Sequence, residues 1–266
     1  MATRDDVRET PFDRHGSMVR WTERAGPLPA RVFIHGLGVN GEAILGAVAD
    51  EPALGGHRSL VIDLPGHGAS DRPTDFSYSL EDHAAAVAAV CAAAGIHGVD
   101  LVGHSLGADI SIVVAYRNPG LVNRLVISEA NLDPLPAMSN GRTSQAIRLQ
   151  SEDEFVTSGF DRLLADNPGW ATMLRACSPI AVYRSAVGLT SGTNPTMREM
   201  FASMTMPRTF LHGDRGEPLL DADGLRRAGI RVVTIPNAGH MVMFDNSPAY
   251  AAAVAAGLVE TRSLHR

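Results

Sequence analysis

The chain has 266 residues, of which 45% are hydrophobic and 20% are charged, and its formal net charge is -6. This length and composition are typical of a globular protein with one sizeable core. The mildly acidic balance argues against nucleic acid or an anionic membrane as the main partner. The two cysteines are too few for a disulfide framework.

The apolar stretches of the sequence are short. The first ten residues are polar and of mixed charge, which predicts that they are not a secretory signal. The alanine-rich run at 84–94 is well below the roughly 18–20 apolar residues that cross a bilayer, and it is typical of a packed helix. We therefore expect a cytoplasmic protein with no membrane partner.

Brief apolar runs alternate with longer helical stretches along most of the chain. An early strand at 18–23 is expected to add to the sheet in the antiparallel sense. The next six runs are almost continuously apolar, as are strands that a parallel sheet buries on both faces, and they lie at 31–35, 58–63, 99–103, 124–128, 208–212 and 230–235. Helices are predicted at 80–94, 107–117, 221–228 and 248–258. This alternation predicts an α/β fold with a doubly wound, mostly parallel sheet.

Residues 131–206 interrupt this alternation, because no convincing strand occurs among them. The segment carries six methionines and several glycines and prolines, and it lies between two predicted strands of the sheet. We interpret it as a helical cap inserted into a core formed by 1–130 and 207–266. Ligands of open α/β sheets bind beyond the carboxyl ends of the strands, so a cap there would roof the site. A helical excursion that serves only packing is the alternative.

The pentapeptide Gly-His-Ser-Leu-Gly at 103–107 carries the strongest functional signal. It fits the G-x-S-x-G pattern and stands between a predicted strand and a predicted helix, which is the context that the motif requires. The tight turn would expose the hydroxyl of Ser105, and the flanking glycines would avoid collisions with the neighbouring strand and helix. A serine needs an adjacent base to react, and His240, just after the last predicted strand, is the candidate.

Four segments in this order resemble the α/β-hydrolase superfamily: HGLG at 35–38, DLPGHGAS at 63–70, GHSLG with the following alanine at 103–108, and NAGH at 237–240. The resemblance implies the α/β-hydrolase fold, but it does not extend to the cap. It also implies an oxyanion hole formed by the backbone N–H groups of Leu37 and Leu106. Asp63 and His67 are expected to shape their loop rather than to react.

The acid that should orient His240 departs from the usual family pattern. In most relatives it follows the strand before the histidine strand, where this chain has Gly216. In some lactone hydrolases and haloalkane dehalogenases it follows the strand after the nucleophile helix, and Glu129 holds that position. We therefore predict that Glu129 completes a catalytic triad with Ser105 and His240, with Asp214 and Glu217 as alternatives.

These residues predict a serine hydrolase that cleaves a carboxylic ester or a lactone through an acyl-enzyme on Ser105. The expected substrate is a small, apolar molecule. The sequence has neither the ligand spacing of a zinc site nor a glycine-rich nucleotide loop, so we expect no metal and no cofactor. Two alternatives stay open: hydrolysis of a C–C bond in a diketone-type substrate, and a ligand-binding receptor on the same fold.

Overall fold

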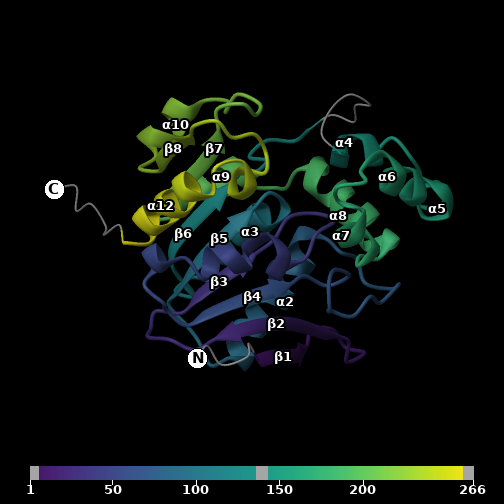
Figure 1. Ribbon diagram of the computed structural model, residues 1–266, viewed down its shortest axis with the longest axis horizontal. Coiled ribbons are helices and arrows are strands. Elements are labelled where there is room, and N and C mark those ends of the chain that lie inside the picture. The colour runs from purple at the N-terminus through teal and green to yellow at the C-terminus, as the bar shows by residue number, and fades with distance from the viewer. Residues whose placement is uncertain (1–5, 136–142, 260–266) are drawn as a thin grey trace.

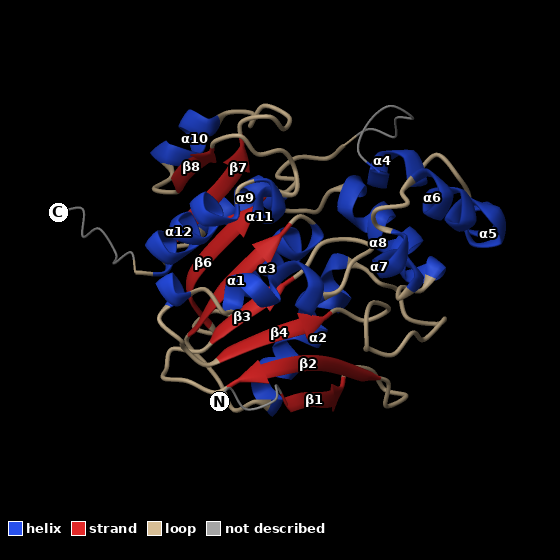
Figure 2. Ribbon diagram, viewed as in Figure 1, coloured by secondary structure: helices blue, strands red, loops and turns tan. Residues whose placement is uncertain are grey.

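The computed structural model describes residues 6–135 and 143–259, which form one eight-stranded sheet with helices around it (Figures 1 and 2). The strand order is β1-β2-β4-β3-β5-β6-β7-β8. The two pairs that involve β2 are antiparallel, and every pair from β4 to β8 is parallel. The strands are Asp6–Pro11 (β1), Met18–Arg24 (β2), Arg31–Ile34 (β3), Ser59–Asp63 (β4), Val99–His104 (β5), Val122–Ser128 (β6), Arg208–Gly213 (β7) and Arg231–Ile235 (β8).

Helices cover both faces of the sheet. Alternate residues of the central strands point to opposite faces and belong to two separate hydrophobic clusters. On β5, Leu101 packs into the cluster that contains α2 and α3, whereas Val102 packs into the cluster that contains α12. The helices of the core are Ala47–Ala49 (α1), Leu80–Ala93 (α2), Leu106–Arg117 (α3), Ala222–Arg227 (α10), Val242–Asp245 (α11) and Ser247–Leu258 (α12), with a π-helical turn at Glu42–Gly46 and a 3-10 turn at Pro52–Leu54. The predicted doubly wound α/β class is confirmed.

The sequence did not predict the edge strand β1 or the helical turns at 42–49. Most of the residues of β1 are exposed, so the strand shows no alternating apolar pattern. Its position is defined by antiparallel backbone pairing with β2. The predicted antiparallel strand near 18–23 is present as β2. The predicted strand at 124–128 begins two residues earlier, at Val122.

Between β6 and β7 the described residues form helices and no strand. These are Thr143–Ile147 (α4), Glu152–Glu154 (α5), Phe160–Asp166 (α6), Ala171–Arg175 (α7), Pro179–Ser191 (α8) and Met197–Ser203 (α9), with a π-helical turn at Phe155–Gly159. Helices α4 to α8 gather beyond the end toward which β3, β4 and β5 point (Figure 2). They share a small hydrophobic cluster of their own around Phe155, Leu174 and Val182.

Helix α9 packs against the core, because Met200 and Phe201 join the main core cluster beside α3. Leu189 of α8 joins the same cluster, so the cap assigned to 131–206 contains helices that pack with the core. Residues 136–142 of that segment, with Met138, lie outside the described residues, as do 1–5 and 260–266 at the ends of the predicted core. Within the described ranges, no helix is long and apolar enough to cross a membrane.

Candidate active site

Ser105 stands in the sharp turn between β5 and α3. Its φ is +54° and its ψ is -122°, a conformation that costs a residue with a side chain about 1–3 kcal/mol. The turn can be this tight because both flanking glycines lie against backbone. A Cβ on Gly103 would lie 2.5 Å from the carbonyl oxygen of Gly107, and one on Gly107 would lie 2.1 Å from that of Ile34. The backbone therefore holds the serine in place.

This crowding predicts that Gly107→Ala destabilises the fold by about 3 kcal/mol or more, since backbone atoms cannot move aside as a flexible side chain can. The free energy of unfolding in urea measures the effect. Gly169→Ala is a matched control, because Gly169 is exposed and a Cβ there would meet nothing within 4 Å. We expect the control to stay within about 0.5 kcal/mol of the wild type. Equal stability of the two variants would contradict this account of the turn.

The structure brings Ser105, His240 and Glu129 together. The His240 Nε2 lies 3.1 Å from Ser105 Oγ, and its Nδ1 lies 3.3 Å from Glu129 Oε2. The other carboxylate oxygen of Glu129 accepts a 2.8 Å hydrogen bond from the N–H of Gly213 at the end of β7. Glu129 is buried, whereas the His240 side chain is 38% exposed. This is the geometry in which a carboxylate orients an imidazole that in turn faces a hydroxyl.

Gly216 lies directly beside the carboxylate of Glu129. A Cβ built on Gly216 would be 3.7 Å from Glu129 Oε2, so an acid placed at 216 would extend into the space that Glu129 now fills from the neighbouring strand. Glu129 itself has a φ of +57°, which is unusual for a residue with a side chain. The backbone therefore turns at Glu129, directly after the end of β6.

The two alternative acids lie on the surface of the same loop. Asp214 and Glu217 are both exposed. The carboxylate of Asp214 accepts a 3.2 Å hydrogen bond from the N–H of Ala238, and hydrogen bonding to the backbone of Asn237 holds the pKa of Asp214 below its usual value. Asp214 thus braces the loop that carries His240, and its contacts give it a structural role.

The loop at 35–38 is held by His35, which is fully buried. The N–H of Leu64 donates to His35 Nε2 over 3.0 Å, so the ring proton resides on Nδ1, which donates to the carbonyl oxygen of Gly36 over 2.7 Å. Within the described ranges, the backbone N–H groups of Leu37 and Leu106 donate to no other group. Neither group is therefore committed to another backbone acceptor, which the predicted oxyanion hole requires.

Two other residues of the family-like segments hold backbone in place. The carboxylate of Asp63 accepts 2.8 Å hydrogen bonds from the N–H groups of Gly41 and Ala69. His67 is fully buried, and its Nδ1 lies 3.0 Å from the carbonyl oxygen of Pro65. Both contacts agree with the structural roles expected for these residues.

A cavity of about 290 Å³ opens over Ser105 and His240. Its floor includes Leu37 from the loop after β3, and its roof includes Trp170 and Leu174 near α7 and Val182 on α8. The helices of the predicted cap thus cover Ser105 and His240, although no motif in the sequence points to the residues of this wall. Asp109 connects the core to the start of the cap segment. The structure shows that this buried carboxylate on α3 accepts a 2.9 Å hydrogen bond from the N–H of Asn131, where the chain leaves the core for the cap.

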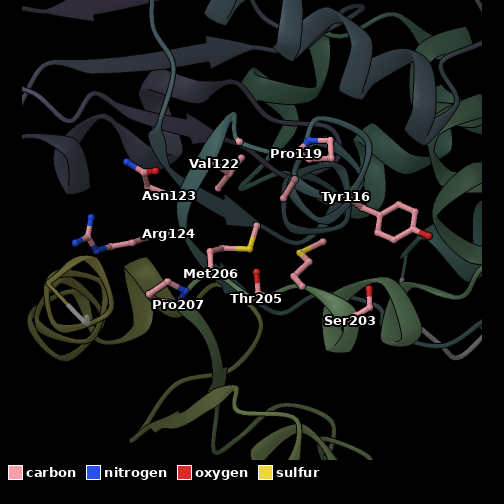
Figure 3. Close-up of a pocket in the computed structure, with 12 residues that line it drawn as sticks. Tyr116, Pro119, Val122, Asn123, Arg124, Ser203, Thr205, Met206 and Pro207 are labelled. Carbon is pink, nitrogen blue, oxygen red and sulfur yellow. The ribbon is translucent and has the colours of Figure 1, made fainter. Parts of the chain in front are cut away.

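A larger cavity, of about 580 Å³, lies at the amino ends of β6 and β7, and Figure 3 shows the residues that line it. It is lined by the residues that start β6 and precede β7, among them Val122 and Pro207. The side chain of Arg124 at its rim forms an ion pair of 3.3 Å with Asp100. The residues that line it include no histidine and no acid, whereas Ser105 and His240 both line the smaller cavity.

Comparison with known proteins identifies the fold family. A family model for the alpha/beta hydrolase fold matches residues 29–157. A 2-(acetamidomethylene)succinate hydrolase from Mesorhizobium japonicum is 26% identical over 242 residues, covering 82% of this chain and 83% of the relative. A 2-hydroxy-6-oxo-2,4-heptadienoate hydrolase from Pseudomonas putida is 29% identical over 181 residues, covering 65% of this chain and 59% of the relative.

Among solved structures, an esterase from Exiguobacterium antarcticum superposes with a TM-score of 0.78 at 17% identity, covering 93% of this chain and 97% of the esterase. At this identity the likeness shows the fold alone. The comparisons together confirm the fold predicted from the motifs and support a hydrolase. The compounds named for the relatives differ from one another, so the comparisons leave open which bond is cleaved.

Proposed function

We propose that this chain, which belongs to the α/β-hydrolase superfamily, is a serine hydrolase that cleaves a carboxylic ester or a lactone. The observation that carries the proposal is the continuous chain of contacts from Ser105 Oγ through the His240 ring to Glu129. The distances of 3.1 Å and 3.3 Å are within or just beyond the reach expected between nucleophile, base and orienting acid.

The reaction follows from these contacts. Ser105 Oγ attacks the carbonyl carbon while His240 Nε2 takes the hydroxyl proton, and Glu129 stabilises the imidazolium that forms. The N–H groups of Leu37 and Leu106 bind the oxyanion of the tetrahedral intermediate. The intermediate then collapses, and His240 gives its proton to the departing alkoxide, which is released as an alcohol. The acyl group stays bound to Ser105 as an ester. A water molecule, deprotonated by His240, attacks this ester, and the acid is released as Ser105 regains its proton.

The second candidate is hydrolysis of a C–C bond, and the similarity to the heptadienoate hydrolase supports keeping it. The lining of the cavity favours the ester or lactone. A dienoate substrate carries a carboxylate, and among the described residues that line the cavity none is a lysine or an arginine that could pair with that charge.

A fluorophosphonate probe tests the proposal, because it reacts with a serine only where a base and an oxyanion hole activate that serine. We expect stoichiometric labelling of the wild type at Ser105, no labelling of Ser105→Ala, and turnover of p-nitrophenyl butyrate by the wild type alone. A folded wild type that neither labels nor turns over any ester would instead favour the ligand-binding receptor.

A further inference from the structure

We propose that the cavity over Ser105 selects an uncharged acyl group of short or medium length and rejects acyl groups that carry a carboxylate. This inference rests on the proposed function, because it concerns the substrate of that same site.

The wall that the cap contributes is apolar. Ile147 on α4, Leu163 on α6, Leu174 on α7 and Leu189 on α8 face the cavity. The polar side chains in the lining, apart from Ser105 and the two histidines, are the neutral groups of Asn131, Thr143 and Ser144. Such a wall gains free energy by covering a hydrocarbon chain, and its few hydroxyl and amide groups can accept or donate a hydrogen bond without a charge.

The arginines of the cap whose contacts the structure defines are occupied elsewhere. Arg184 on α8 forms a bidentate pair of 2.7 Å and 2.8 Å with Glu152. Arg148 donates to the carbonyl oxygens of Leu135 and Thr190 over 3.3 Å and 3.1 Å. None of the described lining residues is a lysine or an arginine. A carboxylate taken into this cavity would therefore lose its water without gaining a cation among the described residues.

A buried carboxylate beside the cavity has the wrong sign for an anionic substrate. Glu129 is buried and lies 3.3 Å from the ring of His240, whose side chain lines the cavity. A substrate carboxylate would thus be desolvated close to another carboxylate. An uncompensated buried charge costs several kcal/mol, and each 1.4 kcal/mol corresponds to about tenfold in affinity.

The volume of the cavity limits the length of the acyl group. Its value of about 290 Å³ lies at the low end of the range of about 300–1,000 Å³ found for ligand pockets. A butyryl or hexanoyl chain suits this space better than a palmitoyl chain. We therefore expect turnover to fall when the acyl chain of a p-nitrophenyl ester is extended from hexanoate to palmitate.

A matched pair of esters tests the charge discrimination in the wild type. The p-nitrophenyl esters of butyric acid and of succinic acid share a leaving group and a four-carbon acyl chain, and differ by a terminal carboxylate. We expect kcat/KM for the hemisuccinate to be at least about 100-fold lower than that for the butyrate. The methyl-capped hemisuccinate should recover to within about tenfold of the butyrate, since the cap removes the charge while adding bulk. A hemisuccinate that reacts within tenfold of the butyrate would overturn the inference.

Binding to Ser105→Ala separates this inference from the proposed function. Trp170 lines the cavity, so quenching of its fluorescence by the nitrophenyl group reports binding without chemistry. We expect the dissociation constant of the hemisuccinate to be at least about tenfold higher than that of the butyrate. A wild type that turns over neither ester would count against the proposed function, while this ratio would still decide the inference. Equal dissociation constants would refute the inference even if the wild type hydrolyses esters.

A cation placed in the apolar wall should weaken the preference for the uncharged ester. Leu163 lines the cavity from α6 and is only partly buried, so a longer side chain has a route to solvent. We expect Leu163→Arg to raise the hemisuccinate-to-butyrate ratio of kcat/KM by about tenfold, whereas Leu163→Met, a neutral change of similar size, should leave the ratio as in the wild type. The same ratio in both variants would contradict the role given to charge.

Discussion

Glu129→Gln should lower kcat by about 10³–10⁴-fold while the protein stays folded. The glutamine side chain has nearly the same shape, and its oxygen can still accept the hydrogen bond that Gly213 donates. Its NH₂ group, however, cannot accept a proton from His240 Nδ1 and cannot stabilise an imidazolium. The imidazole is then held in the wrong tautomer for accepting the proton of Ser105. Turnover of p-nitrophenyl butyrate measures the loss, and urea unfolding verifies the fold.

The two exposed acids of the neighbouring loop provide controls for this loss. Asp214→Asn and Glu217→Gln should each retain activity to within about tenfold, because a side chain outside the triad does not stabilise charge in the transition state. Asp214 braces the loop before His240, so its variant should lower stability more than turnover. If Asp214→Asn abolished turnover and Glu129→Gln left it intact, the acid would have been assigned to the wrong residue.

A relocated acid gives a stricter test, because it asks for a gain of activity. Gly216 has ordinary van der Waals clearance around a Cβ, with contacts of 3.6 Å to the carbonyl oxygen of Gly213 and 3.7 Å to Glu129 Oε2. Glycine is also well suited to the positive φ at 129. We expect the double variant Glu129→Gly, Gly216→Asp to exceed the single variant Glu129→Gly in kcat by at least about tenfold. No gain in a folded double variant would show that a carboxylate at 216 cannot reach His240.

The sequence could predict the candidate triad residues because each follows a strand whose apolar run is unmistakable. Ser105, Glu129 and His240 follow β5, β6 and β8, and the carboxyl ends of parallel strands meet at one edge of the sheet. Whether those three residues do the chemistry is still a prediction. Gly216 was informative for the same reason. Where the usual position of the acid, after β7, holds a glycine, the neighbouring strand β6 can supply a carboxylate from its own carboxyl end.

The cap could not be predicted at the same level, because its contacts join residues with no common periodic pattern. Trp170, Leu174 and Val182 reach the cavity from different short segments, and their apolar character fits core packing as well as a substrate wall. The contact between Asp109 and Asn131 could not be predicted either, because it joins a carboxylate to a backbone N–H, and backbone donors leave no trace in the amino-acid sequence.

A second large effect is expected on stability in mild acid, and it arises from three fully buried histidines behind the active-site loop. The ring of His67 lies 5.3 Å from that of His35 and 6.4 Å from that of His83. Burial lowers the pKa of His35 to about 4 and that of His67 to about 3, and it holds the pKa of His83 well below 6.5. All three are therefore neutral in the folded protein at neutral pH.

Because the folded-state pKa values are lowered, the unfolded chain binds protons first as the pH falls. The stabilising contribution is complete above pH 6.5 or so and is lost progressively as the pH falls from there toward about 3. Each histidine can contribute a slope of about 1.4 kcal/mol per pH unit, so the three together can reach about 4 kcal/mol per unit. Since a typical domain is stable by about 5–15 kcal/mol, we expect unfolding to approach its midpoint near pH 5.

The free energy of unfolding in urea between pH 7 and pH 5 measures this slope above the range in which most carboxylates titrate. The double variant His83→Phe, Ser185→Ala removes one titrating ring together with its 2.9 Å partner on α8, and it should reduce the slope by about a third. His97→Gln is the control, because His97 is exposed and lies outside the cluster, and its slope should equal that of the wild type. The cluster touches both the loop of Leu37 and the cap, through Gly36 and Ser185, so its protonation would loosen the two walls of the cavity together. A flat stability profile down to pH 5 would show that these rings accept protons inside the fold.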